Sequence, residues 1–264
     1  MNDWSEIRSQ CVVWEDGAAL VLNKSAGISV MGERHETDII RMAQEAGEKL
    51  WWVHRIDKVT SGAVLLAKRP DIHGDLTRQF SKRAVDKAYF VITRSGDLPS
   101  RGSIDLPLMT AGSGRVRVAA ERADIEADVS NGRWYVPSRK AFTHTKTYSS
   151  RTNFAKLWED EYHTVLLAQP ITGRRHQIRV HLAWIGYAIE GDPLFDGKSA
   201  SQGSRTCLHS WHLAFEASWA GGVRVEVEAA PGNDFWAPIL GRLPGGDPAA
   251  VMASAHELIR SNPR

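Results

Sequence analysis

The chain has 264 residues, of which 42% are hydrophobic and 24% are charged. These values are typical of a globular protein with a substantial core, and they exclude an intrinsically disordered chain. The formal net charge of +2 is too small to indicate a polyanionic partner by itself. The two cysteines, Cys11 and Cys207, exclude a disulfide framework or a zinc-ligand pattern and favour free thiols in a reducing compartment.

The first predicted elements are two strands joined by a tight turn. Residues 12–14 and 18–22 are strand-forming runs, and the Asp-Gly pair between them is typical of a β-hairpin. A helix is expected next, because apolar residues recur at helical spacing between Thr37, which can cap the helix, and Gly47, which can end it.

A polar loop between two apolar segments is the most informative part of the chain. Residues 51–53 and 63–67 are predicted to form buried strands, and the sequence His-Arg-Ile-Asp-Lys-Val-Thr-Ser-Gly joins them at 54–62. Asp57 therefore stands on a connection that is fixed at both ends, which favours a role in a functional site. The alternative is that Asp57 is a solvated turn residue or half of a surface ion pair.

Basic residues crowd the sequence around this loop. A helix is predicted over residues 71–82, with Leu76 and Phe80 on one face, and a strand follows it at 88–92. The cations of this stretch are Arg55, Lys58, Lys68, Arg69, Arg78, Lys82, Arg83 and Lys87. Their concentration near Asp57 favours contacts with phosphate groups.

The middle of the chain is harder to interpret. Residues 98–142 are rich in Gly, Arg and acidic residues, and they are predicted to form a long surface excursion with a short strand at 115–118. An alternating strand is expected at 162–168, followed by a helix over 176–184. On that helix Arg175 and Arg179 are four residues apart, a spacing that can aim two cations into one cleft.

The last predicted elements are two closing strands and a short helix. The strands lie at 208–215 and 223–227, and the helix lies at 249–259 after a Pro- and Gly-rich stretch. Strands interspersed with few helices predict an α+β fold on a mixed, mostly antiparallel sheet flanked by helices and loops. We expect one catalytic domain over residues 1–243 and a linker with a peripheral helix over 244–264.

Six segments occur in the order found in one enzyme family. They are Asp16 to Gly27, His54 to Gly62, Lys87 to Tyr89, Gly173 to His181, Gly191 to Leu194 and Leu208 to Leu213. Together they resemble the RluA-type pseudouridine synthases, which isomerise uridine to pseudouridine in structured RNA. The resemblance spans residues 12–236 and depends chiefly on the second and fourth segments. It implies the pseudouridine synthase fold without the amino-terminal S4-type RNA-binding domain of some relatives.

The resemblance also implies three catalytic residues. Asp57 would be the carboxylate that acts on ribose C1′, as a nucleophile or as a base. A carboxylate in a water-poor pocket needs a nearby cation to stay ionised, and Arg179 is the candidate; the alternative is that Arg179 forms a surface ion pair. Tyr89 would lie against the target uracil, although an aromatic ring on a strand is equally suited to the core.

RNA contacts are expected from six residues near these motifs. Arg55 would fill the space that a flipped uridine leaves, and His54 would orient the loop by hydrogen bonding. The full set is His54, Arg55, Lys87, Arg174, Arg175 and His176. The reaction leaves nothing for a metal or redox cofactor to do, so none is expected.

Two interpretations of residues 98–142 remain open. The segment is either an irregular flap or an RNA-contacting insertion. In the second case the contacts would come from Arg115, Arg117, Arg133, Arg139 and Lys140.

Two other functions are compatible with parts of the sequence. A noncatalytic RNA-binding or chaperone protein would keep the basic cleft without using the carboxylate, and a glycoside hydrolase would need a second carboxylate opposite Asp57. The amino terminus lacks a secretory signal and no apolar run reaches membrane-spanning length. We therefore expect a cytoplasmic protein, monomeric and without a membrane partner, that acts on ribosomal or transfer RNA.

Overall fold

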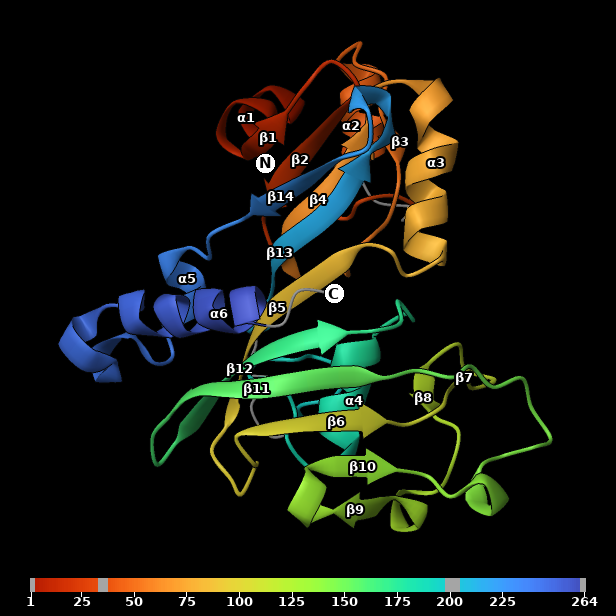
Figure 1. The fold of residues 1–264 in the computed structure, drawn as a ribbon, viewed down its shortest axis with the longest axis vertical. Helices are drawn as coiled ribbons and strands as arrows, with labels where there is room; N and C mark the ends of the chain where they lie inside the picture. Colours follow the sequence, from red (N-terminus) through yellow and green to blue (C-terminus); the bar gives the residue numbers. More distant parts are fainter. Residues whose placement is uncertain (1–2, 33–37, 198–204, 262–264) are drawn as a thin grey trace. The chain divides into compact units, whose positions relative to one another are not determined.

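The computed structural model describes residues 3–32, 38–197 and 205–261. The chain divides into two compact units. Unit 1 comprises Met1–Ala88 and Leu208–Gly232, and unit 2 comprises Tyr89–Cys207 and Asn233–Arg264. Each unit has its own strands and helices, which are labelled in Figure 1.

The strands of unit 1 follow the order β1-β2-β4-β13, with β3 added on β4 and β14 added on β13. Their bounds are β1 (Val12–Glu15), β2 (Ala19–Lys24), β3 (Trp51–Trp52), β4 (Ser61–Ala67), β13 (Leu208–Ala217) and β14 (Val223–Glu228). β4 and β13 run parallel, whereas the other pairs are antiparallel. The predicted hairpin and closing strands are confirmed.

Three helices accompany this sheet. They are α1 (Trp4–Gln10), α2 (Ile39–Glu45) and α3 (Pro70–Ser81), and a 3-10 turn, η4 (Ser218–Ala220), follows β13. α2 is capped by Asp38, whose carboxylate accepts a hydrogen bond from the Arg41 N–H. The cap is therefore one residue later than the predicted Thr37, which lies outside the described residues. Helix α1 was not predicted at all.

The core of unit 1 lies between α3 and the sheet. Leu76 of α3 packs with Val21, Leu65 and Phe215, and none of the four is exposed to solvent. Val53, 3% exposed, belongs to the same cluster at the point where the chain leaves β3. Since each fully buried side chain of this size contributes roughly 1.5–3 kcal/mol, this cluster fixes both strands that border the Asp57 loop, which is residues 54–62.

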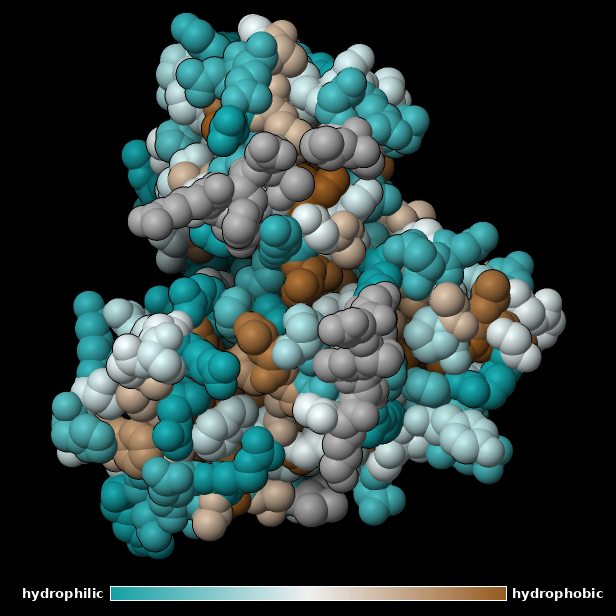
Figure 2. Space-filling view, turned by 180° about the vertical axis from the view of Figure 1, so that it is seen from behind, coloured by the Kyte–Doolittle hydropathy of each residue, from teal (hydrophilic) through white to brown (hydrophobic). Residues whose placement is uncertain are grey.

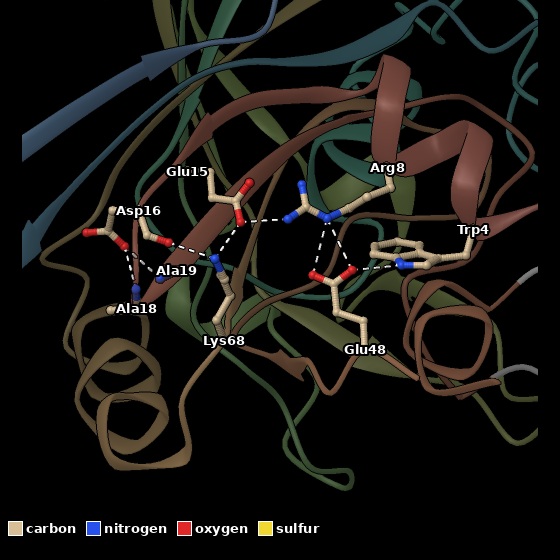
Figure 3. Close-up of polar contacts among 8 residues, drawn as sticks. All are labelled: Trp4, Arg8, Glu15, Asp16, Ala18, Ala19, Glu48 and Lys68. Carbon is tan, nitrogen blue, oxygen red and sulfur yellow. Dashed lines mark hydrogen bonds and ion pairs between the residues drawn. The ribbon is translucent and has the colours of Figure 1, made fainter. Parts of the chain in front are cut away.

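Charged side chains tie the amino-terminal helix to the sheet of unit 1 (Figure 3). The Trp4 indole N–H donates to Glu48 at 2.8 Å, and the Arg8 guanidinium donates to both Glu48 and Glu15. Lys68 donates to Glu15 at 2.5 Å. Hydrogen bonds from Arg8 and Lys68 hold the pKa of the Glu15 carboxyl below its ordinary value. Because these groups are partly exposed, each pair contributes at most about 1 kcal/mol.

The strands of unit 2 follow the order β5-β12-β11-β6-β10-β9, beside a separate β7-β8 ribbon. Their bounds are β5 (Asp86–Arg94), β6 (Arg101–Asp105), β7 (Leu108–Thr110), β8 (Val116–Val118), β9 (Glu126–Asp128), β10 (Arg133–Tyr135), β11 (Thr152–Glu159) and β12 (His163–Pro170). β6 and β10 are parallel and the other pairs are antiparallel. The first three residues of β5 belong to unit 1.

Residues 98–142 are more regular than the sequence predicts. Strands β6 to β10 lie in this segment, with three 3-10 turns, η1 (Arg122–Asp124), η2 (Val129–Asn131) and η3 (Ser138–Lys140). The description of the segment as an irregular flap is therefore wrong, because β6 and β10 extend the sheet beyond β11. The strand predicted at 115–118 is confirmed as β8, whereas β11 was missed.

The helices of unit 2 are α4 (Gln177–Trp184), α5 (Asn233–Trp236) and α6 (Ala249–Ser261), with 3-10 turns η5 (Leu240–Arg242) and η6 (Pro244–Gly246). Trp236 packs against Phe235 at 4.8 Å and Phe90 at 5.5 Å between ring centroids. α6 packs on β11 and buries Val251 and Ala255. The final helix is confirmed, and the boundary at residue 243 stays a prediction.

These elements confirm an α+β fold with mixed, mostly antiparallel strand pairing and flanking helices. Both cysteines are free thiols; Cys11 is half-buried and Cys207 is buried. Within the part of the chain that the structure describes, no helix combines the length and apolar character needed to cross a bilayer.

Candidate active site

Asp57 lies in the tight turn that connects β3 with β4. The Thr60 N–H donates to the Asp57 carbonyl oxygen at 3.0 Å and closes the turn. Val53 and Ile56 are 3% and 6% exposed, whereas Asp57 is half-buried. The apolar residues therefore anchor the backbone that carries this carboxylate, while the side chain stays partly accessible.

A buried lysine joins the Asp57 loop to the end of β2. Lys24 is 1% exposed, and its ammonium donates to the carbonyl oxygens of Ile28 at 2.7 Å and Ser25 at 2.8 Å. The carbonyl of Lys58 lies 3.4 Å from the same ammonium and accepts a further hydrogen bond from the Gly27 N–H at 2.7 Å. Such polar partners are what makes a buried cation tolerable. No role for Lys24 was predicted from the sequence; the signal that could have indicated one is a lysine within a run of apolar strand residues.

The other end of the loop is fixed by a serine, a histidine and a glycine. The Ser61 hydroxyl lies 2.7 Å from Nδ1 of His209, and Nε2 of His209 lies 2.7 Å from the Ala229 carbonyl oxygen. A carbonyl only accepts, so Nε2 carries a proton directed at Ala229, while Nδ1 is the ring atom bonded to Ser61. At Gly62 (φ +105°) a Cβ would lie 2.1 Å from the Ser210 carbonyl oxygen, so only glycine fits between the strands. Sequence analysis assigned none of these roles.

His54 faces the interior of unit 1. Its Nε2 accepts a hydrogen bond from the Leu65 N–H at 3.0 Å, and its ring stacks on Phe80 at 4.3 Å between centroids. Burial, and secondarily the charge of Lys87, lowers the pKa of His54 to about 3. The ring is therefore neutral and orients the loop, in agreement with the expected hydrogen-bonding role. Its contact with RNA stays a prediction.

The other predicted RNA-contacting residues of unit 1 differ in exposure. Arg55, next to Asp57, is exposed, and Lys87 at the start of β5 is half-buried. Both are positioned to add positive potential to the surface of unit 1, and their contacts with RNA stay predictions.

Tyr89 and Arg179 belong to unit 2. Tyr89 is 9% exposed and pairs with Ala168 in the β5–β12 ladder, so its backbone is fixed within the sheet. Arg179 lies in α4 and is 2% exposed. The alternative considered for Arg179, a surface ion pair, is therefore wrong.

The partner of Arg179 within unit 2 is a buried carboxylate. Arg179 Nε donates to Asp192 Oδ2 at 2.6 Å, and Nη2 donates to Oδ1 at 2.8 Å. Asp192 is 0% exposed and also accepts hydrogen bonds from the N–H groups of Leu194 at 2.9 Å and Phe195 at 3.2 Å. The Phe195 ring lies 5.4 Å below the guanidinium. This bidentate pair fixes the plane of the guanidinium. Asp192 occurs in a quoted motif but was not predicted as a site residue.

The start of α4 corrects the prediction for Arg175. The helix begins at Gln177, and His176 before it has a left-handed backbone (φ 55°). Gln177 Oε1 accepts from the Thr172 hydroxyl at 2.6 Å and from the Arg174 N–H at 3.1 Å, which ends the preceding turn. Arg175 therefore precedes the helix, is exposed and donates to a hairpin carbonyl, whereas Arg179 is buried. The two arginines do not share a helix face.

A buried histidine attaches α4 to the strands beneath it. His181 Nδ1 lies 3.0 Å from the Thr152 hydroxyl, and Nε2 lies 3.0 Å from the Ser150 hydroxyl and 3.1 Å from the Leu106 carbonyl. Burial lowers the pKa of His181 to about 4, so the ring is neutral. Like Gln177, His181 therefore positions the helix that carries Arg179.

The predicted catalytic residues are thus divided between the units. Asp57 is in unit 1, and Tyr89 and Arg179 are in unit 2. That the three converge on one substrate stays a prediction. The structure brings together Arg179 with Asp192, and the Asp57 loop with Lys24, Ser61 and His209. Among the described residues, no three His, Cys, Asp or Glu side chains gather as a metal site would require.

The chain matches the RNA pseudouridylate synthase family over residues 18–184. It is 30% identical over 230 residues to ribosomal large subunit pseudouridine synthase C of Pasteurella multocida, covering 82% of this chain and 63% of that protein. It is 31% identical over 221 residues to the dual-specificity RNA pseudouridine synthase RluA of Vibrio vulnificus, covering 81% of this chain and 78% of that protein. The chain thus spans less than two thirds of the first of these relatives.

The fold is similar to that of a solved human protein. Human RNA pseudouridylate synthase domain containing 4 aligns with a TM-score of 0.69 at 23% identity, covering 89% of this chain and 94% of that one. This likeness confirms the predicted pseudouridine synthase fold. The family match favours an enzyme over a noncatalytic RNA-binding protein. From the sequence match and the fold together, the chain belongs to the RNA pseudouridylate synthase family of isomerases.

Proposed function

We propose that this chain isomerises specific uridines in structured RNA with Asp57 as the reacting carboxylate. The observation that carries the proposal is the construction of the Asp57 loop. Its backbone is fixed at one end by Lys24 and at the other by Ser61 and Gly62, while Asp57 itself stays half-buried. A fixed backbone around a partly accessible carboxylate is what chemistry on a bound sugar requires.

The reaction balances without an external reagent. The bond between ribose C1′ and uracil N1 breaks, the base turns, and C1′ bonds to C5. The proton that C5 loses is matched by the proton that N1 gains, and no electron is exchanged with a cofactor. Asp57 can support the electron-poor C1′ as a nucleophile or act as a base toward the sugar, in the way that carboxylates serve glycoside cleavage.

Arg179 and Tyr89 complete the proposed site. A guanidinium near Asp57 would keep the carboxylate ionised, and the Asp192 pair supports this by fixing the guanidinium plane. Tyr89 would lie against the uracil, exclude water from the sugar intermediate and assist loss of the C5 proton. His54, neutral and directed inward, would position the loop, while Arg55 would occupy the space of the flipped nucleotide.

We infer that the substrate is ribosomal RNA, transfer RNA or both. One relative is named for the large ribosomal subunit and another for dual specificity, and these names support both classes. We also propose that the chain acts in the cytoplasm as a monomer. Mapping pseudouridines in total RNA from cells with and without the gene would identify the modified positions.

The role of Asp57 is tested by replacing it. Asp57→Ala should abolish release of tritium from RNA labelled at uracil C5, because each turnover exchanges that proton, while RNA binding stays within about twofold of wild type. The matched control is Asp71→Ala, an exposed carboxylate of the same unit that pairs with Arg69. Pseudouridine formation by the Asp57 variant at the wild-type rate would overturn the assignment.

A further inference from the structure

One end of unit 2 carries cations that no carboxylate neutralises. Residues 107–118, 139–151 and 169–189 contain nine Lys or Arg residues and no Asp or Glu. Four of the nine pair with carboxylates from other segments: Arg117, Lys140, Arg151 and Arg179. Within the described residues the other five make no ion pair: Arg115, Arg139, Lys146, Arg174 and Arg175. These five are also exposed.

Two of these cations lie on one aromatic ring. Lys146 Nζ is 5.4 Å from the centroid of the Tyr148 ring, and Arg174 Cζ is 5.1 Å from it. The backbone of Tyr148 exchanges two hydrogen bonds with Leu108, at 2.8 and 2.9 Å, which fixes the ring beside β7. Arg174 is further placed by a weak hydrogen bond from its Nε to the Ser149 carbonyl at 3.4 Å. The Tyr148 ring therefore extends from a fixed backbone and lies within about 5.5 Å of two positive charges.

The tip of the β7–β8 ribbon joins the same surface. The Arg175 guanidinium donates to the Gly114 carbonyl oxygen, which ties the tip to the turn before α4. Arg115 follows directly, and its carbonyl accepts the Ala111 N–H at 2.8 Å. We call the surface formed by Arg115, Lys146, Tyr148, Arg174 and Arg175 the Tyr148 face. Hydrophilic residues predominate over this end of unit 2, at the left in Figure 2.

Other arginines of unit 2 differ from the Tyr148 face because they pair with a carboxylate of the same unit. Arg133 lies 3.7 Å from Asp105, and Arg151 donates to the same carboxylate at 2.5 Å. The charges of these two side chains are therefore neutralised within the fold. Among the described residues, the cations of the Tyr148 face have no carboxylate partner, so their charge remains available to a ligand.

We propose that the Tyr148 face binds the phosphate backbone of the RNA substrate outside the catalytic residues. The inference rests on the proposed function for the identity of the partner. Lys146, Arg115, Arg174 and Arg175 supply positive charge that neutralises phosphate groups and so releases the counterions bound to the RNA. Tyr148 supplies a flat surface for a base or ribose. RNA fits this surface better than an acidic protein does, because the cations surround a half-buried aromatic ring beside β7.

The experiment measures binding of the intact chain to a fluorescein-labelled synthetic RNA stem-loop across a salt series. Lys146→Ala and Arg174→Ala should each weaken binding about fivefold and reduce the slope of log K against log salt by about 1. Tyr148→Ala should weaken binding about tenfold, and Tyr148→Phe should leave it unchanged, because stacking does not need the hydroxyl. Lys156→Ala is the matched control, since Lys156 of the same unit pairs with Glu159 at 2.5 Å and should not change the slope.

Each outcome bears on only one proposal. Unchanged slopes for the Lys146 and Arg174 variants, in a chain that forms pseudouridine, would overturn the Tyr148 face and leave the proposed function intact. Reduced slopes in a chain that forms no pseudouridine would support the face and overturn the proposed function. Equal loss of affinity for a polyglutamate peptide would show a general anion surface and overturn the assignment to RNA. Thermal unfolding of every variant near the wild-type midpoint verifies that the fold is retained.

Discussion

The Asp57 loop of unit 1 and the Arg179 helix of unit 2 are positioned by different physical means. The loop is fixed by groups that are neutral or that face neutral partners: backbone carbonyls around Lys24, the Ser61–His209 hydrogen bond, the stacked ring of His54 and the close approach at Gly62. Arg179 is fixed by a fully buried carboxylate, Asp192.

The difference determines how each region responds to change. Neutral contacts depend on shape, so an added methyl group disturbs them more than a change in pH or salt does. A buried ion pair depends on both of its members, since removing one leaves an unpaired charge in a poorly solvated site. The two regions can therefore be perturbed separately, and four predictions test this contrast.

The largest effect is expected for Gly62→Ala. The new Cβ would lie 2.1 Å from the Ser210 carbonyl oxygen at a backbone φ of +105°. Because the obstacle is backbone on a paired strand, we expect a loss of about 4 kcal/mol or more in the free energy of unfolding, measured by urea titration. Gly112→Ala is the control, as a Cβ there meets nothing within 4 Å. Equal stability of the two variants would contradict the shape-based account of the loop.

Asp192→Ala should be the most damaging change to the Arg179 region. It removes the two hydrogen bonds that Asp192 accepts from the guanidinium, which is 2% exposed, and we expect a loss of about 3–5 kcal/mol by urea titration. Asp192→Asn keeps the volume and one acceptor and should lose less. Asp234→Ala removes the exposed carboxylate that pairs with Arg205, so it should change stability by at most about 1 kcal/mol. Similar losses for Asp192→Ala and Asp234→Ala would show that burial does not govern this pair.

Ser61→Ala should have an intermediate effect. It removes the hydrogen bond between the Ser61 hydroxyl and Nδ1 of the buried His209 ring, which corresponds to about 1–3 kcal/mol. If the Ser61–His209 hydrogen bond also positions Asp57, kcat should fall by a larger factor than KM rises. Ser81→Ala, at an exposed helix end, should alter neither quantity. A Ser61 variant as active as wild type would separate this hydrogen bond from catalysis.

The smallest effect, over the first pH unit of acidification below 6.5, concerns the pH dependence of stability. The pKa of His54 is about 3 in the folded chain against an ordinary value of 6.5, so between these values the unfolded chain binds the extra proton. Stability should therefore fall on acidification from pH 6.5, by up to about 1.4 kcal/mol per pH unit from this group. His54→Gln keeps an acceptor for the Leu65 N–H and should remove this part of the slope. Parallel profiles of unfolding free energy against pH for wild type and His54→Gln would contradict the assignment of this slope to His54.

Elements with a strong local pattern were predictable from the sequence. The hairpin, α3, α4 and α6 follow from periodicity and turn residues, and each lies within a few residues of its expected position. Strands β6, β7, β9 and β10 were not recognised, because segments of three to five residues are too short to show alternation and depend on neighbours far along the chain. The α1 helix was missed for the same reason of length.

The supporting residues of the candidate site were less predictable than the residues they support. Asp57, Tyr89 and Arg179 stand out through motifs, but Asp192, His209 and Lys24 acquire their roles only from contacts between distant segments. Ser61 and His209, for example, are 148 positions apart. The wrong expectation for Arg175 has a similar origin, because helical spacing was applied across a residue, His176, whose left-handed backbone starts the helix later.

Because the two thiols are unequally buried, one of them can be labelled chemically in preference to the other. Burial raises the pKa of Cys207 to about 12, so this thiol stays protonated and unreactive toward maleimides at neutral pH. Burial also raises the pKa of Cys11, the carboxyl-terminal cap of α1, but this residue is only half-buried and is the less enclosed of the two thiols. A fluorophore or nitroxide would therefore attach to unit 1 without any engineered cysteine, and its signal could report how that unit responds when RNA is added.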